Sequence, residues 1–432
     1  MVKRILIYII YCIVTFCLAT ECFASRDVVN EEDSPFYFDA TSDSTAEVVL
    51  YKSCKQLGAS LIIPEKISIG SKIYKVTGLG QFVFSFCEDL TSVAIPPSVT
   101  SIGEGAFDHC TNLTNITIPP SVTSIGEGAF DHCTNLTNIT IPPSVTSIED
   151  GTFRYCTNLT SITIPPSVTS IGEWAFSSCK RIKQINIPIH VASIAESAFN
   201  WCDSMEEINV DNDNSTYTSI NGVLFNKTKT IILKIPNAKG GSFVIPSSVT
   251  AIEIGAFMGC SRITNITIPD SVTTIGDYAF CRCSGLTNIT IPSNVTSIGH
   301  SAFSDCSGLS SITIPPSVSF IGISAFSGCK GLTSVLIPNS VTSINHGTFN
   351  GCERLAYFTI PSSVTTIKGF AFCDCNGLTN IIIPSSVTSI GKGAFRDCTN
   401  LRVNVNNSRN KVQVGEKAFY KCKSVKWVKP ER

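Results

Sequence analysis

The strongest constraint on this chain is a 23-residue segment that occurs twice in succession without a single change. PPSVTSIGEGAFDHCTNLTNITI spans Pro96–Ile118 and again Pro119–Ile141. Variants of it fill most of the 432 residues, and one phenylalanine marks each of about 14 units. Self-similarity at a fixed period of about 20–29 residues predicts a solenoid of stacked coils. The marking residues are Phe84, Phe107, Phe130, Phe153, Phe176, Phe199, Phe257, Phe280, Phe303, Phe326, Phe349, Phe372, Phe395 and Phe419.

Each unit contains one segment with the alternation of a strand. Ile139 and Ile141 point to one side, while Asn138 and Thr140 point to the other. Pro142-Pro143 then ends the strand, because proline has no backbone N–H to donate. Stacking the units places each strand beside its copy in the next coil. The sequence therefore predicts one long parallel sheet, with turns or short helices on the opposite side of the solenoid.

The repeated motif also resembles a known family. Leu136-x-x-Ile139-x-Ile141 is similar to the core of leucine-rich repeats, and the continuation I-P-x-S-V-T-x-I-G-x-x-A-F-x-x-C resembles the BspA-like (Treponema pallidum-type) leucine-rich repeat surface proteins. The resemblance covers residues 61–422. It implies a leucine-rich repeat solenoid of the α/β class, mostly β, and a role in adhesion to extracellular proteins or cells. Pro-Pro-Ser or Pro-Ser-Ser replaces the Asn or Cys that commoner leucine-rich repeats place after the strand. The resemblance therefore does not predict the curvature of the solenoid.

The two ends of the chain differ from the array. Residues 1–24 have a basic start, an apolar run and a small-residue exit, which predicts a secretory signal peptide. Residues 25–60 contain two strand-like runs and are expected to form a hairpin-like cap, since an open apolar end needs a cover. Residues 423–432 form a basic tail, interpreted either as part of a cap or as a docking patch for an anionic polymer. We see no anchor, so the expected location is secreted or cell-surface.

The segment 209–245 interrupts the period. Its runs Tyr217–Phe225 and Ile231–Ile235 predict an extra hairpin inside a widened coil. Two Asn-x-Thr/Ser sequons, at Asn214 and Asn226, lie inside it and are possible N-glycosylation sites. Structural variation and a partner-binding protrusion are both compatible with the pattern.

Cysteine is abundant, with 20 residues, of which 14 occupy one position of successive units. Each of these follows the marking phenylalanine by three residues and lies on the apolar stripe. We expect buried free thiols rather than disulfides, because a chain with a large core does not need them. Neighbouring coils are close enough for occasional pairing.

No motif in the sequence indicates chemistry. Asp108-His109-Cys110 recurs as Asp131-His132-Cys133, but only because the whole unit is duplicated. We find no nucleophile motif, phosphate loop or paired carboxylates. The prediction is a non-enzyme with no catalytic residue, no cofactor and no metal site. A formal net charge of −1 also excludes the electrostatic signature of nucleic-acid binding.

The remaining source of function is the outward face of the strands. It is dominated by Asn, Ser and Thr, because every residue of a parallel stack faces its own copy and like charges there would repel. The more individual positions are the protein-binding candidates: Gln184, Glu207, Tyr217, Phe225, Leu336 and Tyr357. The chain is thus predicted to bind an extracellular protein or glycan through an extended solenoid face. The alternative is a non-binding spacer in a cell coat.

Overall fold

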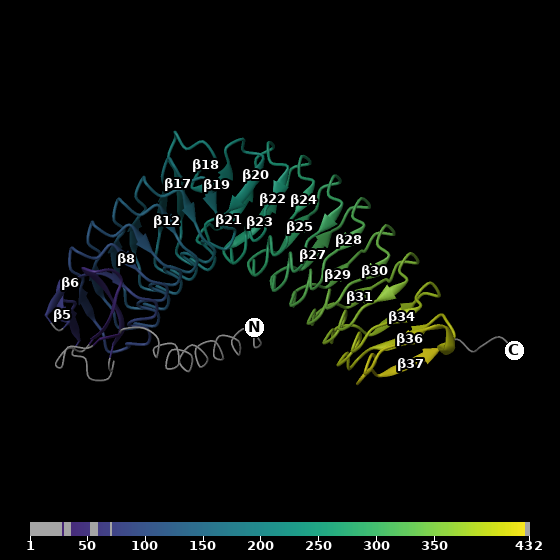
Figure 1. Cartoon of the computed structure of the whole chain (residues 1–432). Helices are drawn as coiled ribbons and strands as arrows, with labels where there is room; N and C mark the ends of the chain where they lie inside the picture. Colours follow the sequence, from purple (N-terminus) through teal and green to yellow (C-terminus); the bar gives the residue numbers. More distant parts are fainter. Residues whose placement is uncertain (1–27, 30–35, 52–58, 70, 428–432) are drawn as a thin grey trace. The chain divides into compact units, whose positions relative to one another are not determined.

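The computed structural model describes residues 28–29, 36–51, 59–69 and 71–427. The predicted signal peptide lies outside these residues. Compact packing divides the chain into a first unit up to Phe176 and a second unit from Ser177. Each unit is a β-solenoid of 23-residue coils, as the repeat predicts (Figure 1). Within the described residues the only helical element is the 3-10 turn Arg409–Lys411, so turns rather than short helices connect the strands.

Two parallel ladders run through the coils of the first unit. The predicted ladder consists of two hydrogen-bonded stretches: β4 (Ser60–Ile62), β7 (Ser92–Ala94) and β9 (Asn115–Thr117) form the first, and β11 (Asn138–Thr140) and β13 (Ser161–Thr163) form the second. The second ladder also has two hydrogen-bonded stretches: β6 (Lys72–Leu79), β8 (Ser101–Ile102) and β10 (Ser124–Ile125) form one, and β12 (Ser147–Ile148) and β14 (Ser170–Ile171) form the other. Partners in both ladders lie one repeat apart, for example Ile139 opposite Ile162. The expectation of a single sheet was therefore incomplete.

Antiparallel strands cover the start of the first unit. The strands involved are β1 (Val28–Val29), β2 (Phe36–Ala40), β3 (Thr45–Tyr51) and β5 (Lys66–Ile69). β2 pairs with β3, and β3 then joins the second ladder through β6. Phe36 packs edge-to-face against Phe84, the first ring of the repeat, at 6.3 Å between centroids. This hairpin thus closes the apolar end of the stack.

The second unit is built from the same two kinds of ladder. The first ladder consists of three hydrogen-bonded sheets. One pairs β15 (Gln184–Ile187) with β17 (Glu207–Val210). The next contains β21 (Gly241–Val244), β23 (Ile263–Thr267), β25 (Asn288–Thr290), β27 (Ser311–Thr313), β29 (Ser334–Val335) and β31 (Tyr357–Phe358), and the last contains β33 (Asn380–Ile383), β35 (Arg402–Val405) and β37 (Ser424–Trp427). The second ladder consists of two sheets. One contains β20 (Ile231–Lys234), β22 (Ala251–Ile252), β24 (Thr274–Ile275), β26 (Ser297–Ile298) and β28 (Phe320–Ile321), and the other contains β30 (Ser343–Ile344), β32 (Thr366–Ile367), β34 (Ser389–Ile390) and β36 (Gln413–Val414). β16 (Ser193–Ile194) occupies the same repeat position but belongs to neither of these two sheets.

The segment 209–245 contains an antiparallel hairpin in the widened coil. β18 (Tyr217–Ile220) pairs with β19 (Val223–Asn226), and β19 pairs with β20. The turn between β18 and β19 uses Asn221 and Gly222 with φ of 51° and 75°, which suits a two-residue hairpin. The carbonyl of Gly222 accepts from the amide of Ile208, so the hairpin folds back on β17.

The core of each unit is a row of stacked phenylalanines. Phe107, Phe130 and Phe153 are fully buried, with centroids 5.4 and 5.6 Å apart and nearly parallel rings. In the second unit the row from Phe257 to Phe419 has centroid spacings between 4.9 and 5.6 Å. Because no coil can bury its ring alone, each coil depends on its neighbours for its hydrophobic stabilisation.

The cysteine position has a polar role that the sequence did not indicate. The thiol of Cys133 donates to the carbonyl of Phe107 in the preceding coil at 3.2 Å, and Cys156 does the same to Phe130. The ladder cysteines from Cys110 to Cys422 are free thiols. Burial raises the pKa of Cys110 to about 12, so the thiolate is disfavoured. Cys87 differs from the expectation, because it is disulfide-bonded.

Serine and threonine side chains also donate hydrogen bonds to carbonyls of the preceding coil. Thr123 donates to the carbonyl of Thr100, and Ser121 donates to the carbonyl of Val99. Asparagines add a side-chain row, in which Nδ2 of Asn135 donates to Oδ1 of Asn112 at 3.0 Å. These bonds explain why short polar residues occupy the turn positions of nearly every coil.

Candidate binding surfaces

The outward face of the first ladder in the second unit has an apolar patch. Leu336, Tyr357 and Ile382 are 74%, 79% and 58% exposed, although their flanking strand neighbours are buried. They belong to three consecutive coils, because Phe326, Phe349 and Phe372 of those coils stack at 5.5 and 5.4 Å. We call these three residues the apolar patch. Leu336 and Tyr357 were predicted as binding residues, whereas Ile382 was not singled out.

The patch differs from the rest of this face. The corresponding positions of the two preceding coils hold Asn288 with Thr290 and Ser311 with Thr313, all short and polar. Ile62 and Val244 are also strongly exposed on strands of the first ladder, but as single side chains. Large apolar side chains exposed to water on neighbouring coils favour a protein contact, since burying them is favourable by about 25 cal/mol per Å².

The other predicted residues lie near the widened coil. Gln184 and Glu207 are exposed and directly opposite each other across β15 and β17. Tyr217 is half-buried, and its hydroxyl accepts a hydrogen bond from the amide of Ile194 at 3.0 Å. Phe225 is 1% exposed and packs in the hydrophobic core, so it cannot contact a partner. Its selection was wrong, because the alternation of a short hairpin strand did not reveal which face is buried.

The two sequons have different surroundings. Asn214 is fully buried, and its Nδ2 donates to the carbonyls of Pro188 and Val191 at 2.8 and 2.9 Å. A glycan on Asn214 is incompatible with this arrangement, which corrects the sequence-based possibility. Asn226 is half-exposed, with Nδ2 donating to the hydroxyls of Thr228 and Thr230. Glycosylation of Asn226 stays a prediction.

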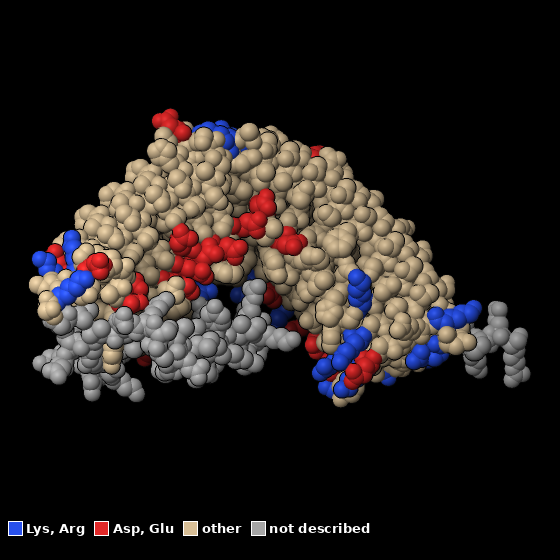
Figure 2. Space-filling model, viewed as in Figure 1, with Lys and Arg blue, Asp and Glu red and all other residues tan. Residues whose placement is uncertain are grey.

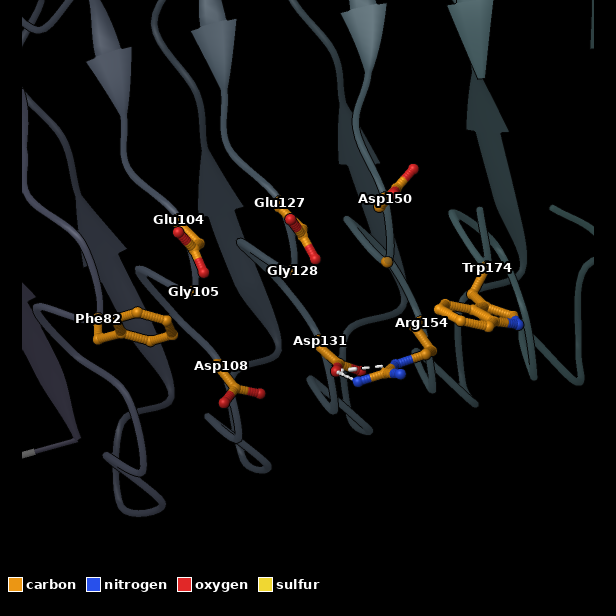
Figure 3. Close-up of a pocket in the computed structure, with 11 residues that line it drawn as sticks. Phe82, Glu104, Gly105, Asp108, Glu127, Gly128, Asp131, Asp150, Arg154 and Trp174 are labelled. Carbon is orange, nitrogen blue, oxygen red and sulfur yellow. Dashed lines mark hydrogen bonds and ion pairs between the residues drawn. The ribbon is translucent and has the colours of Figure 1, made fainter. Parts of the chain in front are cut away.

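A shallow pocket lies on the turns of the first unit (Figure 3). Its floor is glycine at one repeat position, where Gly105, Gly128 and Gly151 have φ between 54° and 60°. Phe82 and Trp174 occupy that same position in the coils on either side, so two aromatic rings close the ends. Glycine fits here because it adopts positive φ without strain. At Gly105 a Cβ would also clash with the ring of Phe82, whereas the space above Gly128 and Gly151 is open.

The walls of the pocket are acidic. Glu104, Glu127 and Asp150 line one wall from successive coils, and Asp108 and Asp131 line the other. Acidic side chains gather over the turns of this unit in Figure 2. Burial, together with the neighbouring charges of Glu104 and Asp150, raises the pKa of Glu127. The acidic wall and the glycine floor are visible in the sequence, as G-E-G, G-E-G, E-D-G and G-E-W at one position of successive units. Most of the predicted binding residues lie instead on the strand face.

One cation already neutralises part of this wall. Arg154 is paired with Oδ2 of Asp131 in the preceding coil, through Nη2 and through Nε at 2.9 Å. The arrangement attracts cations, and it contains no nucleophile–base pair among the described residues that line it.

Beside the pocket, four rings from consecutive coils form a stack on the surface. Phe86, His109, His132 and Tyr155 have successive centroid distances of 4.5, 4.1 and 4.3 Å. Each residue has positive φ, between 56° and 59°, which turns its side chain outward at the same point of its coil. Nδ1 of His109 lies 2.7 Å from Oδ1 of Asp108. Burial lowers the pKa of His109, but the hydrogen bond and charge of Asp108 outweigh it, and the net pKa is raised.

A search for membrane-spanning helices found no long apolar helix in the described part of the chain. Comparison with curated proteins gave no significant match. The family model described as a BspA type leucine rich repeat region (6 copies) matches residues 77–206, 123–239, 237–355 and 324–431.

Solved structures show the same fold. A leucine-rich cell surface protein from Faecalibacterium prausnitzii is 30% identical, with a TM-score of 0.58, over 90% of this chain and 98% of that protein. A leucine-rich repeat protein from Bacteroides ovatus is 28% identical, with a TM-score of 0.52, over 93% and 100%. The pneumococcal vaccine antigen PcpA is 18% identical, with a TM-score of 0.62, over 93% and 98%, which shows the fold alone. The chain therefore belongs to the BspA-type leucine-rich repeat family.

Proposed function

We propose that this protein is exported and binds an extracellular protein through the apolar patch of Leu336, Tyr357 and Ile382. The observation that supports the proposal most is the exposure of three large side chains on consecutive coils of a mainly polar face. Unpaired apolar surface in water is costly to keep unless a partner covers it. The similarity to a leucine-rich cell surface protein supports the same location.

The chemistry of the patch favours a protein partner. Leucine and isoleucine offer no hydrogen bond to a sugar, whereas exposed aliphatic side chains together with a tyrosine are typical of the centre of a protein contact. Gln184 and Glu207 would supply a separate polar contact near the widened coil, since they are exposed and adjacent. The predicted signal peptide at residues 1–24 supports export, and N-terminal sequencing of the secreted protein tests it.

The repeat itself provides matched substitutions for the test. Leu336→Thr, Tyr357→Ser and Ile382→Thr install the residues that neighbouring coils hold at the same positions, as in Thr313, Ser334 and Thr359. The triple variant should therefore fold, which circular dichroism checks. Binding to a panel of purified extracellular-matrix proteins and to whole cells is then measured by surface plasmon resonance and flow cytometry.

We expect at least about a tenfold loss of binding in the triple variant, because truncating centrally placed contact residues commonly costs more than about 1.4 kcal/mol. The control Val244→Thr removes an isolated exposed side chain and should bind as the unchanged protein. Equal binding by the triple variant would refute the patch as the contact site. No binding by any form, including the unchanged protein, would favour the spacer alternative. Glu207→Ala is a separate arm that tests the polar contact.

A further inference from the structure

The duplication of one coil places two Asp-His pairs side by side. His109 and His132 occupy the same position of identical neighbouring coils, and their rings are stacked 4.1 Å apart with an interplanar angle of 15°. One oxygen of Asp108 and one ring nitrogen from each histidine lie within 4.8 Å of one another. Neither copy of the coil could bring these three groups together alone.

The histidines are held in place from outside. The rings of Phe86 and Tyr155 cover the two ends of the pair, and Asp108 contacts Nδ1 of His109 at 2.7 Å. The oxygen of Asp108 and Nδ1 of His109 lie close enough to bind one ion together, in place of the hydrogen bond between them. Side-chain exposures of 31% and 29% leave both imidazoles accessible from solvent.

A second observation concerns hydrogen bonds that are not completed. Nδ1 of His132 and Oδ1 of Asp131 are buried atoms that lie 2.9 Å apart, yet neither forms a hydrogen bond of good geometry within the described structure. Buried polar atoms in folded proteins are nearly always satisfied, so an incomplete pair needs an explanation. A cation coordinated by the histidines would balance the charge of this carboxylate, whose other oxygen is held by Arg154.

We propose that Asp108, His109 and His132 form a binding site for a divalent transition-metal ion. Two imidazole nitrogens and a carboxylate oxygen are donors that suit Zn²⁺, Ni²⁺ and Cu²⁺ rather than Ca²⁺ or Mg²⁺, which prefer all-oxygen sites. Ligand bonds of about 2.0–2.2 Å require the three atoms to draw together from their present separation. Small rotations of the exposed side chains provide this, and the outer positions of the ion stay open to water.

The test uses the full-length mature protein and Zn²⁺ as the probe in isothermal titration calorimetry. We expect one Zn²⁺ per chain, and at least about a tenfold weaker affinity in His109→Phe, in His132→Phe and in Asp108→Asn. Phenylalanine preserves the stack, because Phe86 occupies the same position in the preceding coil. His346→Phe, on a different coil, is the control and should bind Zn²⁺ normally. Visible absorption of Co²⁺ reports whether nitrogen ligands are present.

Two results would overturn the site. One is Zn²⁺ binding that persists in His109→Phe and His132→Phe but disappears in Glu127→Gln, which would assign the ion to the acidic wall. The other is absence of stoichiometric Zn²⁺ binding by the unchanged protein. Deleting one copy, Pro96–Ile118, offers an independent variant: the array stays in register, but only one histidine of the pair remains, so the affinity should fall as in the single substitutions.

Discussion

Replacing Phe130 by alanine is the sharpest test of the stacked core. The ring is fully buried between Phe107 and Phe153 at 5.4 and 5.6 Å, and both contacts are lost with it. Phenylalanine-to-alanine changes in well-packed cores cost about 3–5 kcal/mol. Because two neighbouring rings lose their stacking partner here, we expect the upper end, about 4–5 kcal/mol.

The effect should spread along the coils rather than stay at one site. Stability in a solenoid is approximately a sum of coil and interface contributions, and this substitution weakens two interfaces. Amide hydrogen exchange by mass spectrometry measures this loss of stability coil by coil. A local measurement is needed because a global free energy of unfolding is poorly defined for a long array. Exchange should accelerate in residues 96–165, with little change beyond Phe257.

Phe419→Ala is the matched control. Phe419 stacks face to face on Phe395 at 5.6 Å, meets Trp427 edge to face at 6.3 Å, and is less buried than Phe130. Its loss should cost less than that of Phe130 and should affect only the last coils. Equal effects of the two substitutions, or unchanged protection from hydrogen exchange around Phe130, would refute the argument that each coil depends on stacked phenylalanine rings on both sides.

Buried and charged groups give three further predictions. Native protein should react poorly with a thiol reagent, because burial raises the pKa of Cys110, Cys202 and Cys352 to about 12, whereas denatured protein should expose these thiols; rapid native labelling would contradict the burial. Burial lowers the pKa of Lys234, so the folded state binds fewer protons than the unfolded state, and stability should rise with pH toward the usual lysine range; urea unfolding of Lys234→Met should lack this slope. Arg154→Gln removes the partner of Asp131 and should lower the local free energy of unfolding of the turn by about 1–3 kcal/mol, because a charged hydrogen bond is lost. Unchanged hydrogen exchange in residues 127–156 would contradict this prediction.

The sequence predicted the parts of the fold that repeat. Ile139, Ile141 and Phe130 recur at fixed spacing, so the side-chain directions worked out for one unit apply to every regular unit of the array. The second ladder was missed because Ser124–Ile125 is only two residues long, too short for alternation to be visible. The thiol bonds to carbonyls of the preceding coil were also invisible, since they depend on contacts between coils.

The sites were harder to predict than the fold. Leu336 and Tyr357 stood out because they interrupt columns of short polar residues. Those columns follow from the 23-residue repeat alone. Phe225 lies outside the period, and its burial is decided by how the hairpin folds back on β17. The histidine pair was dismissed because duplication explains its sequence, yet stacking of the duplicated coils is what brings the two rings together.

The direction of the side-chain bonds between coils has a consequence for how such a protein can change its length. Thr123, Ser121 and Cys133 all donate to carbonyls of the coil before them, and those carbonyls belong to the backbone. An inserted coil of 23 residues therefore meets acceptors it can use, whichever coil precedes it. The two identical copies at Pro96–Ile118 and Pro119–Ile141 show that such an insertion is tolerated. Gain or loss of whole units can thus change the number of coils in the array while keeping the hydrogen bonds that join neighbouring coils.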